Sequence, residues 1–472
     1  MGLLCRGMNQ QIASPELLKV VQSTNELPSF WKENVAFVAN LLALFFGNEE
    51  QTKLLAEEVG EVDSYGGRLL PIIDLLFAGK GKNVLVLERE PDPYLREFFT
   101  DVAGLSLPDV EILPHREYRK IGQEMERSEM LNHEIVKRLG AHEARRMDGY
   151  VTDDTLGRLV EVLGKRTFST VEGSRRGNNK RLLHEYLETE GLPLPITEIA
   201  ASPGEVPGCL KKLEQRGFNS AVIKAAMGAS GIGMIHVDHL SGCDLPAETV
   251  PEYFFSEGPC LVQGWLKAGC FGITKLRSPS VQLFLNEDTV TMYDVTEQIL
   301  SQASVHEGNE SPPPYLGEHP EWREELLRQA SVAAKWLHTQ GYRGTASADF
   351  LLAEKDDGGF EVYVCELNAR VTGATYPAVL AKHFMPDGVW LLRNLRFTDP
   401  LPGKKLLELL KRSHDLYVPG KSGSGIFPLN FNFGPDGLIH KGQFLCLAPS
   451  SGGSRMLLDL AKLDLPCRPD RD

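Results

Sequence analysis

Three polar residues at alternate positions of a predicted strand are the clearest sign of chemistry in this sequence. Residues 360–364 are β-branched and aromatic, as is typical of a strand, and Glu366, Asn368 and Arg370 follow at every second position. Side chains alternate across a strand, so these three point the same way. Carboxylate and amide oxygens suit Mg²⁺, and a guanidinium binds phosphate with two parallel hydrogen bonds. Taken alone, the triplet is more typical of the solvated face of an edge strand.

A second carboxylate on a neighbouring strand changes this interpretation. Residues 347–352 form another apolar strand, joined to the first through a turn centred on Asp357 and Gly358. This turn predicts a register that places Asp349 opposite Glu366. Opposed residues have Cβ atoms about 5 Å apart, where like charges are destabilising, so we expect a divalent cation between them. A slip of one residue would move Asp349 to the other face of the sheet.

The composition narrows the class of protein. The chain has 472 residues, 42% of them hydrophobic, which predicts two to four domains with packed cores. A net charge of −14 argues against nucleic acid or an anionic membrane as a partner. Eight cysteines without a CxxC pair indicate reduced thiols and a cytoplasmic location. The apolar run 35–46 is shorter than the ~18 residues of a membrane span, so we predict a core helix there.

Two lysines and a glycine-rich loop form a second group of candidates. Lys180 falls in the first turn of a helix that Asn178 or Asn179 caps. The helix dipole disfavours a cation there, so this lysine either lies on the surface or is held by a bound anion. Lys224 ends a strand, and residues 227–233 form a loop before the next strand. Such a loop is either a flexible hairpin turn or a phosphate-binding loop; its position between two strands excludes a Rossmann turn or a Walker P-loop.

The remaining segments predict the secondary structure of the chain on either side of these residues. Residues 1–165 alternate strand and helix and indicate an α/β domain. After Pro377 we predict helices to about residue 416, then a linker at 419–425. Two strands, 426–433 and 438–447, close the chain.

The order of these motifs resembles the ATP-grasp superfamily over roughly residues 179–376. Residues 296–298, 341–345 and 366–373 are most similar to the peptide ligases of the pheganomycin type. The resemblance implies an α/β pre-ATP-grasp domain at 1–165 and an ATP-grasp fold with an N-terminal lobe at 166–255. It also implies a C-terminal lobe with a metal site at 256–418 and a small C-terminal β-hairpin module at 419–472.

The same resemblance implies a role for each site residue. Arg370 would bind the transferred phosphoryl group, and the acid that often holds the ribose has no match in residues 267–270. The ligands to Mg²⁺ would be Asp349, Glu366 and Asn368, with Gln298 a weaker candidate. The ATP contacts would come from Lys180, Lys224, the loop residues Met227, Gly228, Ala229, Ser230, Gly231, Ile232 and Gly233, and, for adenine, from Gln263 and the backbone of Trp265 and Leu266.

The implied activity is that of an ATP-dependent carboxylate–amine ligase, which forms an amide through an acyl phosphate and releases ADP and phosphate. Its expected partners are ATP, a small carboxylate such as an amino acid or peptide, and an amine acceptor. Neither nucleic acid nor membrane is expected, and a homodimer is an open alternative. Two rival activities share the ATP site: a phosphotransferase with a hydroxyl acceptor, and a regulatory nucleotide-binding protein without turnover.

Overall fold

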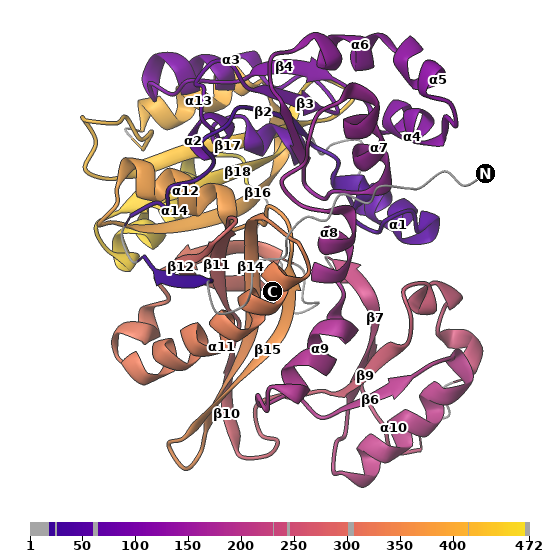
Figure 1. Cartoon of the computed structure of the whole chain (residues 1–472). Helices are drawn as coiled ribbons and strands as arrows, with labels where there is room; N and C mark the ends of the chain where they lie inside the picture. The colour runs from indigo at the N-terminus through magenta and orange to yellow at the C-terminus, as the bar shows by residue number, and fades with distance from the viewer. Residues whose placement is uncertain are drawn as a thin grey trace, which may run out of the picture.

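The computed structural model describes residues 18–23, 26–59, 65–229, 231–242, 246–300, 306–413 and 415–467. Within these ranges the strands form one ten-stranded sheet and two four-stranded sheets, with helices packed around them (Figure 1). None of the helices in this part of the chain combines the length and apolar character needed to cross a membrane.

The N-terminal region is built on a parallel sheet in the order β4-β3-β2-β5, which confirms the predicted α/β fold. Both central strands are buried at every residue, as in a sheet covered on both faces. The strands are β2 (Val35–Val38), β3 (Val84–Leu87), β4 (Asp109–Ile112) and β5 (Arg146–Gly149). The helices are η2 (Leu41–Ala43), α1 (Glu49–Val59), η3 (Tyr65–Leu69), α2 (Ile73–Leu76), α3 (Pro93–Glu97), η4 (Phe98–Val102), α4 (His115–Gln123), α5 (Arg127–Asn132), α6 (Glu134–Ala141) and α7 (Asp154–Leu163).

The predicted helix over residues 35–46 is wrong. The run begins with the central strand β2 and continues into the short helix η2. A continuous apolar run has no period that separates a buried strand from a buried helix. Here the parallel neighbours β3 and β5 decide the outcome, because they pair with β2 on both sides.

The next region carries the smaller antiparallel sheet, in the order β6-β9-β7-β8. Helix α9 lies between this sheet and the large sheet, in contact with β7 and β15 (Figure 1). The elements are α8 (Val171–Gly177), α9 (Lys180–Thr189), β6 (Thr197–Ala200), η5 (Pro203–Glu205), α10 (Val206–Gln215), β7 (Ala221–Ala229), β8 (Ile232–Val237), η6 (Ala247–Thr249), η7 (Glu252–Phe255) and β9 (Cys260–Gly264).

The large sheet has the order β10-β14-β11-β12-β13-β16-β18-β17, with β1 beside β12 and β15 beside β14. Its strands are β1 (Lys19–Gln22), β10 (Ile273–Arg277), β11 (Pro279–Leu285), β12 (Thr289–Leu300), β13 (His306–Ser311), β14 (Gly344–Lys355), β15 (Phe360–Asn368), β16 (Val389–Leu401), β17 (Gly425–Phe433) and β18 (Ile439–Ala448). The accompanying helices are η8 (Pro314–Gly317), α11 (Pro320–Thr339), α12 (Thr375–Phe384), α13 (Gly403–Arg412) and α14 (Ser451–Asp464).

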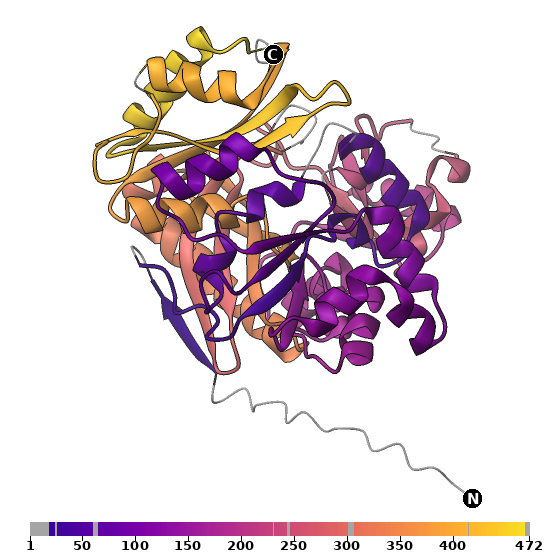
Figure 2. The same ribbon diagram turned by 90° about the horizontal axis from the view of Figure 1, so that it is seen from above.

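The prediction of helices throughout residues 377–416 is wrong in its middle, where β16 forms. This strand pairs with β13 on one side and β18 on the other, so it joins the two predicted C-terminal strands to the large sheet. The two strands themselves are confirmed. They lie beside the N-terminal region (Figure 2), where Phe427 of β17 stacks on Phe99 with ring centroids 5.7 Å apart.

The two faces of the large sheet differ in chemistry. Helix α11 covers one face with Leu326, Ala330, Ala333 and Leu337, all fully buried, against alanines and leucines of β11 and β14. The opposite face of these strands carries polar side chains. The register on that side pairs Asp349 with Glu366, as predicted.

Candidate active site

Lys180 connects three elements of the site. The side chain of Asn179 accepts hydrogen bonds from the backbone N–H groups of Arg181 and Leu182 and so caps α9, which places Lys180 at the first helical position. Its Nζ lies 2.7 Å from Oε2 of Glu366 on β15 and donates to the carbonyl oxygen of Gly228 at 2.9 Å. The predicted alternatives for this lysine were the surface or a bound anion. The structure shows a largely buried lysine, 10% exposed, held by a carboxylate of the protein.

Lys224 and Gln263 lie near Lys180, and all three line the same cavity. Burial lowers the pKa of Lys224, and the charge of Lys180 lowers it further. Gln263 on β9 donates to the hydroxyl of Thr197 at 3.0 Å. The three residues line one small cavity, of about 10 Å³ for the centre of a water-sized sphere, together with Leu183, His184, Leu187, Leu261, Val364 and Cys365.

The prediction of a loop over residues 227–233 is wrong at both ends, because Met227–Ala229 belong to β7 and Ile232 and Gly233 to β8, which together form a hairpin. Gly231 and Gly233 both have φ of +81°, a left-handed conformation that favours glycine. A Cβ on Gly228 would lie 2.6 Å from the carbonyl oxygen of Ile232, so a larger residue does not fit there. Ser230 lies outside the described residues. The predicted glycines therefore serve a close approach of two backbone strands.

A side chain from the N-terminal region holds this hairpin. The buried Gln51 of α1 donates to the carbonyl oxygen of Met227 at 2.9 Å. Met227 and Gly228 then line a second cavity, also of about 10 Å³ for the centre of a water-sized sphere, on the other side of Lys180. The other residues around this cavity are Leu44, Phe45, Asn178, Leu367, Asn368 and Arg370.

The carboxylate of Asp349 accepts hydrogen bonds from three side chains. The hydroxyl of Ser280 donates to Oδ1 at 2.6 Å and that of Ser347 at 3.1 Å, while the amide of Asn368 donates to Oδ2 at 2.8 Å. Burial and the nearby charge of Glu366 raise the pKa of Asp349 to about 6. Burial alone would raise the pKa of Glu366 as well, but the cations around it hold that pKa below its usual value.

This donor set fits Mg²⁺. Magnesium is usually held by one or two carboxylates, with substrate phosphates and water as further ligands. The facing carboxylates of Asp349 and Glu366 and the amide oxygen of Asn368 supply such a set. Across the described ranges, no group of three or more His, Cys, Asp and Glu residues could hold a metal ion, so a metal at this place would need further ligands from substrate phosphates or water.

Three predicted residues lie apart from this cluster. Gln298 pairs with Asn309 on β13, and in the described part of the chain no hydrogen bond joins its side chain to Asp349 or Glu366. The backbone N–H of Trp265 donates to the carbonyl oxygen of Ser220, just before β7, at 2.9 Å. Leu266 packs against the apolar core of that lobe. Their predicted roles toward metal and adenine stay predictions.

Asn178 is the main residue whose place in the candidate site the sequence did not indicate. Its Oδ1 accepts from Arg370 Nη1 at 3.0 Å and from the backbone N–H of Ala369 at 3.2 Å. Its amide donates to the carbonyl oxygens of Ser174 and Ala369. The sequence offered Asn178 or Asn179 as the cap of α9, and Asn179 takes that role. Asn178 instead fixes the guanidinium that the resemblance assigns to the phosphoryl group.

The comparisons with known proteins bear on this arrangement. No family model matches the chain. The "[Butirosin acyl-carrier protein]--L-glutamate ligase" of Niallia circulans is 28% identical over 203 residues, which cover 43% of this chain and 45% of that protein. The chain therefore matches less than half of this relative's length.

Solved structures resemble nearly the whole chain. A biotin carboxylase from Campylobacter jejuni, in complex with beta-gamma-ATP, aligns with a TM-score of 0.54 at 14% identity, and the alignment covers 93% of this chain and 92% of the carboxylase. An N5-carboxyaminoimidazole ribonucleotide synthetase in complex with ADP aligns with a TM-score of 0.53 at 12% identity and covers 92% and 97%. The chain has an ATP-grasp fold. The two small cavities beside Lys180 lie between the small antiparallel sheet and the large sheet.

Both cavities are too small for a nucleotide. Each cavity, of about 10 Å³ for the centre of a water-sized sphere, is close to the minimum that holds one water molecule. If ATP binds at this place, the β7–β8 hairpin and Lys180 must move away from Glu366 to make room for it. The ion pair between Lys180 and Glu366 is the contact that such a movement would break.

Proposed function

We propose that the protein is an ATP-dependent carboxylate–amine ligase that activates its carboxylate as an acyl phosphate. The observation that carries this proposal is the convergence of Lys180, Asp349, Glu366, Asn368 and Arg370 at one buried place between the lobes. This place combines cations for phosphate with oxygen ligands for a divalent metal. A free carboxylate is a poor electrophile, and phosphorylation provides it with a leaving group.

Each residue has a defined task in the first step. Asp349, Glu366 and Asn368 would hold Mg²⁺, which when bound neutralises charge on the phosphate oxygens. Once ATP separates Lys180 from Glu366, this lysine is free to bind phosphate. Arg370, fixed by Asn178, binds the transferring phosphoryl group. Catalysis of this kind depends on positioning and on charge stabilisation, so it requires no nucleophile from the protein.

In the second step the amine attacks the acyl carbon. The C–N bond forms, the C–O bond to phosphate breaks, and inorganic phosphate leaves with one oxygen of the original carboxylate. The rival phosphotransferase would use the same ATP site with a hydroxyl acceptor. The similarity to a protein named as a ligase favours amide formation. A regulatory protein without turnover is disfavoured, because binding of nucleotide alone does not require both carboxylates and Arg370.

The proposal also includes the chemical class of the substrates. Residues 366–373 resemble the pheganomycin-type peptide ligases, and the relative from Niallia circulans is named for L-glutamate and an acyl-carrier protein. We therefore propose an amino acid or peptide as one of the two substrates.

An ADP-release screen of amino acids and peptides, in pairs and with Mg²⁺, tests this function. Mass spectrometry of the products should show a condensation product whose mass equals that of the two substrates less one water. The Asp349→Asn variant serves as the inactive control. A product that carries a phosphoryl group would support the phosphotransferase, and absence of ADP with every acceptor would support the regulatory alternative.

A further inference from the structure

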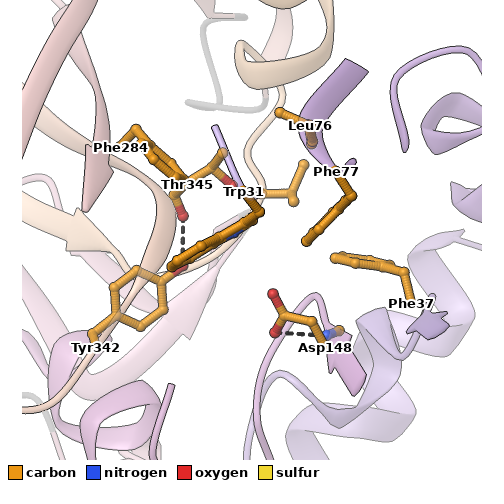
Figure 3. Close-up of a pocket in the computed structure, with 10 residues that line it drawn as sticks. Trp31, Phe37, Leu76, Phe77, Asp148, Phe284, Tyr342 and Thr345 are labelled. Carbon is orange, nitrogen blue, oxygen red and sulfur yellow. Dashed lines mark hydrogen bonds between the residues drawn. The ribbon is translucent and has the colours of Figure 1, made fainter. Parts of the chain in front are cut away.

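Asp148 is a buried carboxylate that the proposed reaction does not use. It lies on β5 and is 8% exposed. Its Oδ1 accepts from the backbone N–H of Gly149 at 2.9 Å, while the other oxygen points toward a group of aromatic rings (Figure 3). The nearest cation along the strand, Arg146, is paired with Glu33 at 2.9 Å. Within the described residues, Asp148 has no ion pair.

A small cavity faces this carboxylate. It offers about 20 Å³ to the centre of a water-sized sphere, which is enough for a group the size of water or an ammonium head. Aromatic residues form its walls, and their π faces attract cations. Both the N-terminal region and the large sheet contribute, through Trp31, Phe37, Phe77, Phe284 and Tyr342 (Figure 3).

The cavity lies along the same face of the sheet as the candidate metal site. Thr345 lines the cavity, and Thr345, Ser347 and Asp349 occupy alternate positions on β14. Four residues of a strand span about 13 Å. The neighbouring strand β11 shows the same arrangement. Its Phe284 pairs with Thr345 and lines the cavity, and its Ser280 pairs with Asp349 at the candidate metal site.

Arg370 of the candidate active site lies near the cavity beside Asp148. Val371, which follows Arg370, also lines the cavity. Burial raises the pKa of Tyr342, and the charges of Asp148 and Arg370 act on it in opposite directions, so its phenol is near both. The cavity is therefore a neighbour of the group that we assign to the phosphoryl transfer.

We propose that this cavity binds a primary ammonium group of the substrate, with Asp148 as its counter-ion and the aromatic rings as its walls. This inference rests on the proposed function, which requires an amine or amino-acid substrate. A buried carboxylate without a cation is costly, and a small cation bound beside it offsets that cost. In the absence of such a cation, burial raises the pKa of Asp148 to about 7, as expected for a carboxylate that lacks a partner.

Titration of the full-length protein with methylammonium chloride, in the absence of ATP, tests the site. Ionic strength is kept constant with NaCl, and tryptophan fluorescence is recorded at pH 8, because Trp31 lines the cavity. We expect a saturable change with methylammonium and none with tetramethylammonium, which is too large for the cavity. The Trp31→Phe variant should lose the signal.

Two acidic variants provide the matched comparison. Asp148→Asn should weaken the binding of methylammonium by about tenfold or more, because a charged partner is lost. Asp109→Asn, a change at an exposed residue of the edge strand β4 in the same sheet, should respond as wild type does. An equal response to methylammonium and tetramethylammonium in wild type would overturn the proposal, as would no response at all or an unchanged response in Asp148→Asn. Since the titration involves no turnover, its outcome is independent of whether the protein proves to be a ligase.

Discussion

Lys180 and Glu366 form an ion pair of 2.7 Å between the first residue of α9 and the end of β15. The lysine is assigned to ATP phosphate and the carboxylate to magnesium. In the absence of both ligands these two groups neutralise one another inside the protein. On the proposed function, binding of magnesium and ATP would exchange one protein–protein ion pair for two protein–ligand interactions.

This ion pair predicts that Glu366→Gln destabilises the protein without ligands. The change leaves Lys180 buried beside a neutral amide, which should lower the free energy of unfolding by about 1–3 kcal/mol. It should also abolish turnover. Urea denaturation at pH 8 measures the stability. A second change, Lys180→Met, made in the Glu366→Gln protein should recover most of the loss.

Asp349→Asn is the matched control for that prediction. Burial and the charge of Glu366 oppose ionisation of Asp349, while hydrogen bonds from Ser280 and Ser347 favour it, so the neutral side chain should cost less stability than Glu366→Gln does. Equal destabilisation by both variants would show that the ion pair with Lys180 is not the cause.

Lys224→Ala should weaken the binding of ATP by about tenfold or more and leave the fold intact. Burial disfavours the charge of Lys224, so the folded protein gains little from it when ATP is absent. Calorimetric titration with ATP and Mg²⁺ measures the effect. Lys211→Ala, an exposed lysine on α10 of the same lobe, should bind as wild type does. Unchanged affinity in Lys224→Ala would remove this residue from the site.

Asn178→Ala should lower kcat by about ten- to a hundredfold with little change in the affinity for ATP. Asn178 holds the guanidinium of Arg370, and a displaced catalytic group is costly in rate. Asn179→Ala removes the cap of α9 and should instead cost about 1 kcal/mol of stability, with near-normal turnover of the folded protein. The same loss of rate in both variants would indicate a general effect on α9.

Asp148 predicts a pH dependence of stability. Burial raises its pKa from 3.8 to about 7, so the folded state keeps a proton that the unfolded state has lost between these values. Stability contributed by this proton is present below pH 4 and decreases as the pH rises to 7, by up to about 4 kcal/mol. Asp153, whose pKa burial raises to about 6, acts in the same direction. The measurement is therefore the difference between wild type and Asp148→Asn, and the variant should gain in relative stability from pH 5 to pH 8. A constant difference would show that Asp148 is ionised throughout.

Local sequence signals predicted the parts of the site that depend on local geometry. The Asp357–Gly358 turn fixes the register of β14 and β15, so the pairing of Asp349 with Glu366 followed from it. The asparagine before Lys180 likewise predicted the first turn of α9.

The remaining features depend on contacts between distant segments. The hydrogen bond of Asn178 to Arg370 joins residues 192 positions apart, and no periodicity reports such a contact. Asp148 lies in a charged stretch, and only the packing of the N-terminal region on the large sheet places it beside aromatic rings. The strand β2 has the same apolar composition as a buried helix and is determined by its neighbours.

Transfer of oxygen from the carboxylate to phosphate tests the central claim most directly. A substrate found in the ADP-release screen would be labelled with ¹⁸O in its carboxylate and incubated with ATP, Mg²⁺ and the amine. We predict that the released inorganic phosphate carries one labelled oxygen for each amide formed, and that hydroxylamine in place of the amine gives the hydroxamate. Release of ADP with a phosphorylated product and unlabelled phosphate would contradict the acyl-phosphate mechanism.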